Sequence, residues 1–565
     1  MSKGNIKYDV CIVGSGAGAG PVAFELSKAG YKVLILEKGP WFETKDFTKD
    51  EIVSSRRSVY TPNLKDEQHV IEKKNSKGEW IAKSTYKTGR DFWNGSCVGG
   101  SSNFMSGYFH RMKPKDFSLL SEYGEIDGAN IVDWPISYED MEPYFSKVEK
   151  EVGVSGRVIS HSAQEPRSTA DYPFPPLAEN IISTWIDKAA NEQGYNMVPV
   201  PRAILSRPKD DRNACVYSNY CGSYGCSSDA KGSSRASLLN TALKTGNLTI
   251  LPNSKVYHLE TDGDSNITKA HYYNIDGEKK TVEAKLFVVA AQAIETSRLL
   301  LMSKNDEFPN GLANNSGQVG KNLLFSAGGT GSGHIYFDDL PKNDAVKLNT
   351  QGVFVNRSIH NWYEINDDKL GGKAKGGVVD FLFEHANPMT KTIHQKWDDS
   401  GNLVYGSALK TKIKKYFTEQ RRIKFEIFCD WLPTNDCNVT LSEDVKDKWG
   451  DPVAKVRTGY HKHDLKVGRF LAKKSRDILK GIGAKDIESN ISGAPPANLQ
   501  AGGCRFGDNP KLSVLDSNCK AHEVNNLYVT DGSFMPTGGS VTYTWAIFAN
   551  SFRVADIIKD KLRMV

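Results

Sequence analysis

A glycine-rich turn between two apolar runs near the N-terminus constrains the fold of this chain more than any other feature. The first run and the turn read Tyr8-Asp-Val-Cys-Ile-Val-Gly14-Ser-Gly16-Ala-Gly18-Ala19-Gly20. A second apolar run, Val33-Leu-Ile-Leu36, ends at Glu37. This order predicts a strand, a turn, a helix over about 17–29, and a second strand that ends at an acidic residue. It is the order of the βαβ units that bind dinucleotides.

The residues of this turn have separate predicted roles in a dinucleotide cradle. Gly14 permits the tight turn, and Gly16, with Gly18 beside it, lets the backbone approach a pyrophosphate. Ala19 takes the third consensus glycine position, where close helix–strand packing tolerates alanine. The N–H groups at the start of the helix point at the phosphates. Glu37 can accept hydrogen bonds from a ribose diol.

Length and composition indicate a soluble globular protein of two or more domains. The chain has 565 residues, which is more than one ordinary core supports. Its content of 39% hydrophobic and 25% charged residues fits globular proteins. The net charge of +6 is small for this length, and no basic block with interleaved aromatic residues occurs. We therefore expect no nucleic-acid partner.

The sequence carries no export or membrane signal that we recognise. No apolar run reaches the ~18 residues that a spanning helix needs, and the start of the chain before the first strand is short and polar. We expect no transmembrane segment and no signal peptide in this chain. Because a partner chain can carry an export signal, two locations stay open. The protein is cytoplasmic, or it is exported and membrane-associated through a partner subunit.

Two patterns alternate along the chain and predict a discontinuous nucleotide-binding domain. Buried strands followed by helices are expected at 285–291 with 293–303 and at 526–530 with 544–562. Short alternating strands at 334–337, 424–429 and 438–441 are typical of a mostly antiparallel sheet. The predicted organisation is a nucleotide-binding domain from 1–112, 230–327 and 495–565, a cap and cysteine-bearing region over 113–229, and a substrate domain over 328–494.

Four further segments, in order along the chain, carry a family resemblance. They are Gly95-Ser-Cys-Val-Gly99-Gly100-Ser101-Ser102-Asn103, Asp133-Trp-Pro135, Ala290-Ala-Gln-Ala-Ile-Glu-Thr-Ser-Arg-Leu-Leu300 and Asn526-Leu-Tyr-Val-Thr-Asp531-Gly532-Ser533. With these motifs the chain resembles the glucose–methanol–choline (GMC) flavoprotein oxidoreductases nearly end to end. Within that family it is most similar to bacterial sugar and sugar-acid dehydrogenases, such as gluconate 2-dehydrogenase flavoprotein subunits.

The resemblance implies a fold and an activity. The fold is α/β, with a Rossmann-type FAD-binding domain that is interrupted by a mostly antiparallel β-sheet substrate domain. The activity is FAD-dependent oxidation of a CH–OH group of a sugar, sugar acid or polyol, by hydride transfer to flavin N5. Electrons then pass to an acceptor other than oxygen. A cytochrome c-type subunit and a small chaperone-like subunit are the partners that the resemblance suggests.

The resemblance also assigns cofactor contacts beyond the N-terminal turn. The positions that it implies for FAD are Gly99, Gly100, Ser101, Ser102, Asn103, Val256, Ala290, Asp531, Gly532, Thr542 and Thr544. Glycines let backbone N–H groups come close to the flavin, and serines offer hydroxyls. Some relatives attach the flavin covalently through a histidine just after the two serines. Asn103 takes that place here, so we expect non-covalent FAD.

The chain departs from the family where the substrate proton is usually handled. Alignment on Gly502 places Leu499 at the usual catalytic histidine, and Thr542 stands at the usual histidine or asparagine. Imidazole suits that task because its ordinary pKa of ~6.5 lets it accept a proton near pH 7. Leucine cannot accept a proton, and Thr542 can serve the substrate only as a hydrogen-bond partner.

Three explanations for this departure stay open. A base can come from elsewhere, with His110 or the pair His461 and His463 as candidates, while Gln500 and Tyr543 orient the substrate. The substrate can be one that is easily oxidised and needs little general-base help. The chain can also be a flavin-binding electron-relay or non-catalytic subunit.

Three cysteines lie close together in the sequence, at Cys215, Cys221 and Cys226. Three thiolates in a glycine-containing loop can hold an iron–sulfur cluster, since each iron needs one thiolate. The resemblance implies such a cluster in some bacterial sugar dehydrogenases, although with a different spacing. The alternative is three reduced cysteines in a packed loop, and the sequence leaves both open. The other six cysteines are scattered, so a disulfide framework is not expected.

Overall fold

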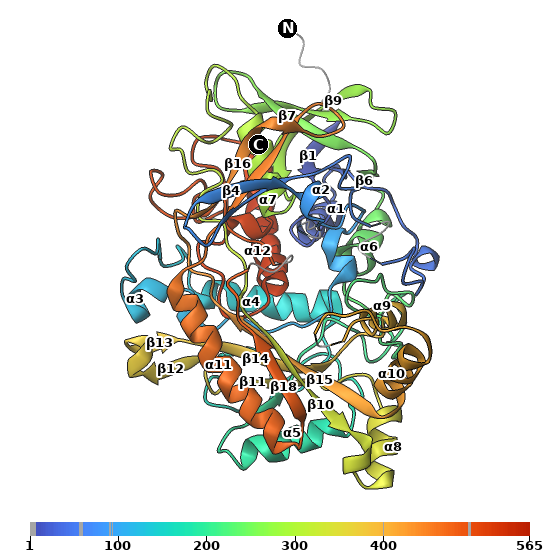
Figure 1. Cartoon of the computed structure of the whole chain (residues 1–565). Coiled ribbons are helices and arrows are strands. Elements are labelled where there is room, and N and C mark those ends of the chain that lie inside the picture. The colour runs from blue at the N-terminus through green and yellow to red at the C-terminus, as the bar shows by residue number, and fades with distance from the viewer. Residues whose placement is uncertain are drawn as a thin grey trace.

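The strand that precedes the N-terminal glycine turn belongs to a seven-stranded sheet in the upper half of the molecule (Figure 1). The computed structural model describes residues 7–55, 60–89, 92, 94–398, 400–494 and 499–564. The sheet order is β6-β2-β1-β9-β8-β7, and β19 pairs with β9. The strands are β1 (Tyr8–Val13), β2 (Val33–Leu36), β6 (Leu248–Leu251), β7 (Lys255–Thr261), β8 (Ile267–Tyr273), β9 (Lys279–Val289) and β19 (Leu527–Val529). The pairs that β1, β2, β6, β9 and β19 make with one another are parallel, as in a Rossmann-type unit.

Helices cover this sheet because their apolar residues face its central strand. In β1 the side chains of Val10, Cys11 and Ile12 are fully buried, which is typical of a parallel strand with both faces covered. Helix α1 (Gly20–Lys28) packs on the long C-terminal helix α12 (Tyr543–Arg563). Phe24 and Phe552 meet edge to face between them at 6.3 Å. The two ends of the chain are therefore held together in one core.

A second, antiparallel sheet forms the lower half of the molecule (Figure 1). Its order is β18-β10-β15-β14-β11-β5, and every pair in it is antiparallel. The strands are β5 (Met197–Pro199), β10 (Ala327–Tyr336), β11 (Arg357–Ile359), β14 (Gly377–Phe383), β15 (Gln420–Cys429) and β18 (Lys485–Asn490). Helix α11 (Lys462–Gly481) packs on it with buried Leu471 and Ile478 against Phe381 and Phe425.

A third sheet lies beside helix α7 (Ala293–Met302) of the upper half. Its order is β16-β17-β3-β4, with β3 (Val70–Lys74), β4 (Trp80–Ser84), β16 (Cys437–Lys446) and β17 (Pro452–Thr458). The strand expected at 438–441 is thus present, but it pairs away from the six-stranded sheet. Val439 of this strand is buried in the same apolar cluster as Ile294 of α7. The strand reaches this sheet by pairing with β17, which in turn pairs in parallel with the N-terminal β3.

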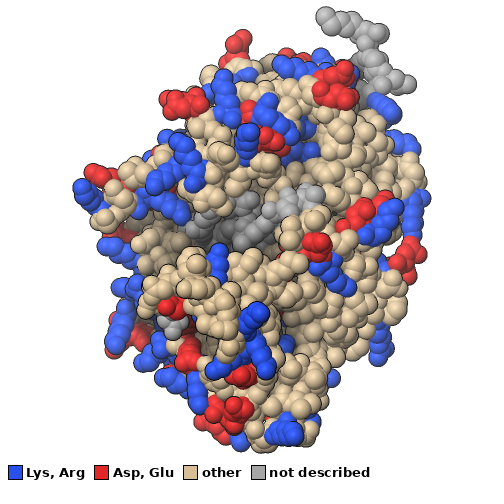
Figure 2. Space-filling view, turned by 45° about the vertical axis from the view of Figure 1, so that its right-hand side comes forward, with Lys and Arg blue, Asp and Glu red and all other residues tan. Residues whose placement is uncertain are grey.

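The α/β fold expected from the sequence is confirmed, with a parallel sheet and a mostly antiparallel second sheet. The expected helices at 293–303 and 544–562 correspond to α7 and α12. The face in Figure 2 carries intermixed positive and negative side chains and is hollowed between the two halves. Among the described helices, none combines the length and apolar character needed to span a bilayer. The domain boundaries stay a prediction.

We predict that the free energy of unfolding depends strongly on the buried side chains of the central strand β1. Ile12 lies between β2 and β9 and is fully buried, whereas Ile275 in a turn is 74% exposed. We expect Ile12→Ala to cost about 2–5 kcal/mol through lost burial and the remaining cavity, and Ile275→Ala to change stability by less than about 0.5 kcal/mol. Thermal unfolding of both variants checks this, and equal melting temperatures would contradict the assigned core.

Candidate functional site

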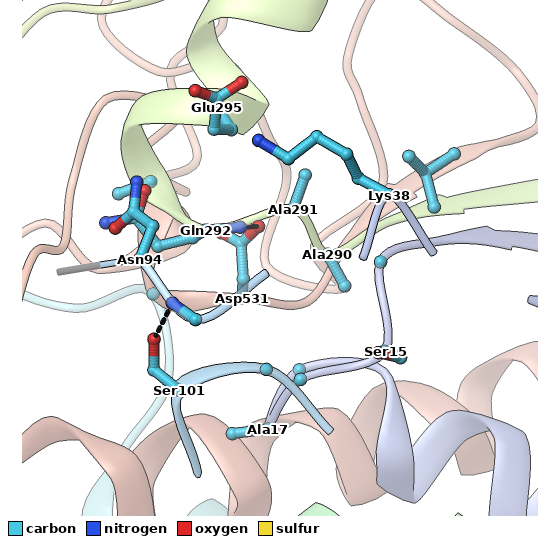
Figure 3. A pocket seen from close by; sticks show the side chains of 18 of the residues that line it. Ser15, Ala17, Lys38, Asn94, Ser101, Ala290, Ala291, Gln292, Glu295 and Asp531 are labelled. Carbon is cyan, nitrogen blue, oxygen red and sulfur yellow. Dashed lines mark hydrogen bonds between the residues drawn. The ribbon is translucent and has the colours of Figure 1, made fainter. Parts of the chain in front are cut away.

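One pocket runs along the carboxyl ends of the parallel strands, where α/β sheets usually bind ligands. Segments far apart in sequence line it, and Figure 3 shows side chains from several of them around one space. The lining positions are 13–18, 36–38, 94–96, 100–102, 105, 254–256, 290–293, 295, 298–299, 302, 499–500, 531–532, 543–544 and 547.

The glycine turn is shaped by close backbone contacts. Gly14 has φ +93°, and a Cβ there would lie 2.4 Å from the carbonyl oxygen of Ala290. A Cβ at Gly18 would lie 2.7 Å from the backbone of Asp531. A Cβ at Gly16, in contrast, would meet no atom within 4 Å, because this residue faces the pocket. Gly14 and Gly18 therefore serve chain packing, and Gly16 leaves room for a ligand.

Helix N-termini converge on this pocket. The turn at 16–18 leads directly into α1, residues 291–293 lead into α7, and Tyr543 and Thr544 are the first residues of α12. The start of each helix carries a partial positive charge. At α7 some N–H groups already have partners, since Gln292 N donates to Asp531 Oδ2 at 2.9 Å and Ile294 N donates to Gln292 Oε1 at 3.0 Å. Such an arrangement favours an anionic ligand such as a pyrophosphate.

Glu37 lies buried at the end of β2, with 6% of its surface exposed. One carboxylate oxygen accepts a hydrogen bond from Ser15 Oγ at 2.6 Å, and the other accepts one from Gly39 N at 2.8 Å. Burial raises the pKa of Glu37 against the effect of these hydrogen bonds. Each oxygen keeps a free acceptor site, so the carboxylate can still receive a ligand hydroxyl.

The loop after Gly99 forms the opposite wall as a short 3-10 helix, Gly100–Phe104. Ser101 Oγ accepts a hydrogen bond from Gly95 N at 2.8 Å (Figure 3). Asn103 Nδ2 donates to Val98 O at 2.9 Å. Asn103 thereby holds the loop's own backbone and is absent from the pocket lining, as are Gly99, Ala19 and Thr542. The other twelve positions implied for the cofactor line the pocket.

A charged group at one end of the pocket was not foreseen from the sequence. Lys38, Lys255, Glu295 and Arg298 line it, and Figure 3 shows the Lys38 amine pointing toward Glu295. Burial alone would raise the pKa of Glu295, but the charges of Arg298 and Lys38 hold it well below its usual value. Only the spacing of Glu295 and Arg298 on one helix face gave a signal.

Three of the positions expected to handle the substrate also line the pocket. Leu499 lines it with φ +60°, a left-handed conformation that is unusual for leucine. Gln500 and Tyr543 line it too. Gln500 Nε2 donates to Phe92 O at 3.1 Å, and Tyr543 Oη donates to Phe325 O at 2.7 Å. Thr542 Oγ1 donates to Tyr108 O at 2.9 Å.

The structure does not bring the three candidate histidines to this pocket. His110 is 2% exposed, and its Nε2 lies 3.0 Å from both carboxylate oxygens of Asp380 on β14. His461 begins α11 as its N-cap residue, with Nε2 at 2.9 Å from Asp127 O. His463 lines a separate cavity between α11 and residues 119–126. The partners of His110 and His461 belong to distant segments, so spacing along the chain could not predict this placement.

The three neighbouring cysteines form no metal site in the structure. Cys215, Cys221 and Cys226 are partly buried against a small apolar cluster that includes Leu205. Burial raises the pKa of Cys215 to about 11 and also raises that of Cys221. Within the described ranges, no three His, Cys, Asp or Glu side chains gather as metal ligands. The arrangement therefore does not show an iron–sulfur cluster, and the choice between the two alternatives stays a prediction.

Comparison with known proteins defines the class. Residues 176–326 match the N-terminal family model of the GMC oxidoreductases, and residues 433–551 match the C-terminal one. The chain belongs to the GMC oxidoreductase family, as its motifs indicated. Members of this family are FAD flavoproteins.

Similarity to individual proteins extends over the whole chain. The 2-methyl-1,2-propanediol dehydrogenase of Mycolicibacterium austroafricanum is 28% identical over 98% of this chain and 95% of its own length. The fructose dehydrogenase large subunit of Gluconobacter japonicus is 27% identical over 100% of both chains. The gluconate 2-dehydrogenase flavoprotein of Pantoea cypripedii is 22% identical over 98% and 94%. Formate oxidase from Aspergillus oryzae shares the fold, with a TM-score of 0.65, 15% identity and 99% coverage of both chains.

The contrast between two glycines predicts how the pocket responds to substitution. Gly16→Ala adds a methyl group that only a bound ligand would meet, so we expect a normally folded protein with little flavin. Gly18→Ala forces a backbone contact apart, so we expect lower stability as well. Flavin absorbance per chain and thermal melting separate the two effects. A Gly16→Ala protein with full flavin content would contradict the assigned role.

Proposed function

We propose that this chain binds FAD non-covalently in the pocket and oxidises a CH–OH group of a small polyhydroxy compound. One observation carries the proposal. The N-termini of α1, α7 and α12 face a single pocket, and the space beside the Cα atom of Gly16 is empty. The segments that resemble the family's cofactor motifs line the same pocket. The family membership supports the reaction class, and the relatives named above act on a branched diol, fructose and gluconate.

The residues present fit FAD at each part of the pocket. The turn at 14–18 and the start of α1 would hold the pyrophosphate, and Glu37 a ribose diol. Asp531, whose carboxylate accepts hydrogen bonds from Gln292 N and Ser533 N, would fix the adjoining turn. When bound, FAD supplies the two-electron acceptor for the hydride.

The pocket residues near the vacant histidine position offer orientation rather than strong basicity. Tyr543 is buried, and burial together with the nearby Asp430 charge raises its pKa well above the usual value, so its hydroxyl stays protonated. Gln500 is a neutral hydrogen-bonding group. The Tyr543 hydroxyl donates its proton to Phe325 O, and Gln500 Oε1 accepts a hydrogen bond from Gln292 Nε2 at 2.5 Å. We propose that these two residues orient the substrate through the acceptor sites that their oxygens keep. The carboxylates Glu37, Glu295 and Asp531 are each already engaged by donors or cations.

The proposed enzyme also needs an electron acceptor and a cellular location. The fructose dehydrogenase relative is by its name a large subunit, so we propose that electrons leave this chain through a partner subunit of cytochrome c type, and that a small subunit accompanies it. The location, cytoplasmic or exported with a partner, stays a prediction. The competing hypothesis of a relay or non-catalytic subunit is decided by the next experiment.

Anaerobic mixing with substrates tests the enzyme hypothesis directly. We expect the purified yellow protein to lose its flavin absorbance when sugars, sugar acids or polyols are added without oxygen, and denaturation to release intact FAD. Gly16→Ala serves as the control that should show no bleaching. A yellow state that persists across a broad alcohol panel, and is reduced only by a partner protein, would establish the relay function instead.

We also predict that a histidine placed at position 499 accelerates flavin reduction. Because Leu499 lines the pocket in a left-handed conformation that histidine adopts more readily, Leu499→His can place an imidazole there. We expect it to accelerate flavin reduction about 10²–10⁴-fold near pH 8, the usual range for a general base. Leu499→Met is the size control and should leave the rate near the wild-type value. An unchanged rate for Leu499→His would show that another group already removes the proton.

A further inference from the structure

A helical hairpin stands out from the six-stranded sheet on the side of the molecule where Figure 1 labels α9 and α10. It spans residues 388–418, between β14 and β15, with α9 (Pro388–His394) and α10 (Gly406–Thr418). An isolated bridge joins Trp397 to Leu403 between the helices. Among its described residues none is buried, so this segment contributes little to the core.

The hairpin exposes an unusual share of the protein's apolar side chains. Seventeen large apolar residues in the described part of the chain are strongly exposed, and six of them lie within these 31 positions. Met389, Ile393 and Trp397 follow one another at intervals of four residues, with exposures of 49%, 57% and 46%. Leu403 and Tyr405 continue the row at 58% and 77%. We call these five residues the apolar row.

A loop of the other half of the molecule extends the apolar row and holds it in place. The carboxylate of Glu51 accepts hydrogen bonds from Met389 N at 2.8 Å and Thr390 N at 2.7 Å, and so caps the first turn of α9. The next residues, Ile52 and Val53, are 68% and 56% exposed. The exposed apolar surface is therefore built from two separate segments that are tied together.

The hairpin is basic, and two of its lysines lie beside Trp397. The hairpin contains six lysines and two aspartates. Lys396 lies 5.2 Å from the ring centre of Trp397, and Lys412 Nζ donates to Trp397 O at 2.5 Å. In the described structure Lys391 pairs with Glu384 at 3.7 Å, while the other five lysines form no ion pair. Their charges remain available to an anionic surface.

We propose that the helical hairpin docks the protein on an anionic lipid bilayer. Tryptophan and tyrosine prefer the level of the lipid headgroups, with an apolar body on one side and a polar tip on the other. Lysine stems lie along apolar surface while their amines reach anionic phosphates. A protein partner fits less well, because lysine is depleted at protein–protein interfaces. This contact requires no partner subunit and goes beyond the proposed redox activity.

Vesicle sedimentation tests the proposal with the full flavin-loaded chain. We expect binding to vesicles of phosphatidylcholine with phosphatidylglycerol at low salt, much weaker binding to pure phosphatidylcholine, and release in concentrated KCl. The double variant Lys396→Glu with Lys412→Glu changes the two lysines that lie beside Trp397. It should weaken binding by more than tenfold, since each lysine near the surface contributes about fivefold. Trp397→Ser with Tyr405→Ser should weaken binding even at low salt.

Matched controls use α8 (Lys342–Thr350) of the same half of the molecule. Lys342→Glu with Val346→Ser changes one exposed lysine and one side chain with 55% exposure outside the hairpin, and should leave vesicle binding unchanged. Flavin content and melting temperature confirm that every variant is folded. Three results would overturn the proposal: no sedimentation with either vesicle, equal loss in the α8 control, or self-association that Trp397→Ser abolishes while vesicle binding is absent.

Discussion

Close backbone contact between the N-terminal glycine turn and two distant segments is the constraint on which the rest of this structure depends. Gly14 approaches the carbonyl of Ala290, and Gly18 approaches the backbone of Asp531. The carbonyl of Gly18 also accepts hydrogen bonds from Thr530 Oγ1 at 2.7 Å and from Ser551 Oγ at 2.6 Å. These contacts bring the starts of α1, α7 and α12 to one space. A side chain at either glycine would push the segments apart and separate the groups that form the pocket.

The two halves of the molecule divide the work that the family membership implies. The parallel sheet presents helix N-termini and a buried acid, which suit a dinucleotide. The antiparallel sheet buries one face against α11 and is joined to the upper half by residues such as His110, which pairs with Asp380. Ligand sites commonly lie where two such units meet. Tyr543 of α12 lies where the two halves meet. Its hydroxyl donates a hydrogen bond to the carbonyl of Phe325, two residues before β10 begins at Ala327.

Much of the fold followed from local patterns, and less of the site did. Buried apolar runs and glycine turns predicted β1, β2, α7 and α12 close to their observed bounds. The cofactor motifs were found by their resemblance, and twelve of sixteen positions line the pocket. The pairing partners of the strands were harder to predict. The strand at 438–441 joins the sheet of the N-terminal strand β3 through β17, and no local sequence pattern encodes this pairing. The charged group around Glu295 and Lys38 was missed for the same reason.

The class of this protein could be predicted from its amino-acid sequence, because the glycine turn, the acid at Glu37 and the ordered motifs depend on short-range spacing. The same sequence also shows that Leu499 and Thr542 replace the usual proton-handling residues. Long-range contacts settled where each histidine lies, how the three neighbouring cysteines pack, and which apolar residues stay exposed on the helical hairpin. Burial and ion pairing join residues hundreds of positions apart, as with His110 and Asp380, and spacing along the chain carries no information on such contacts.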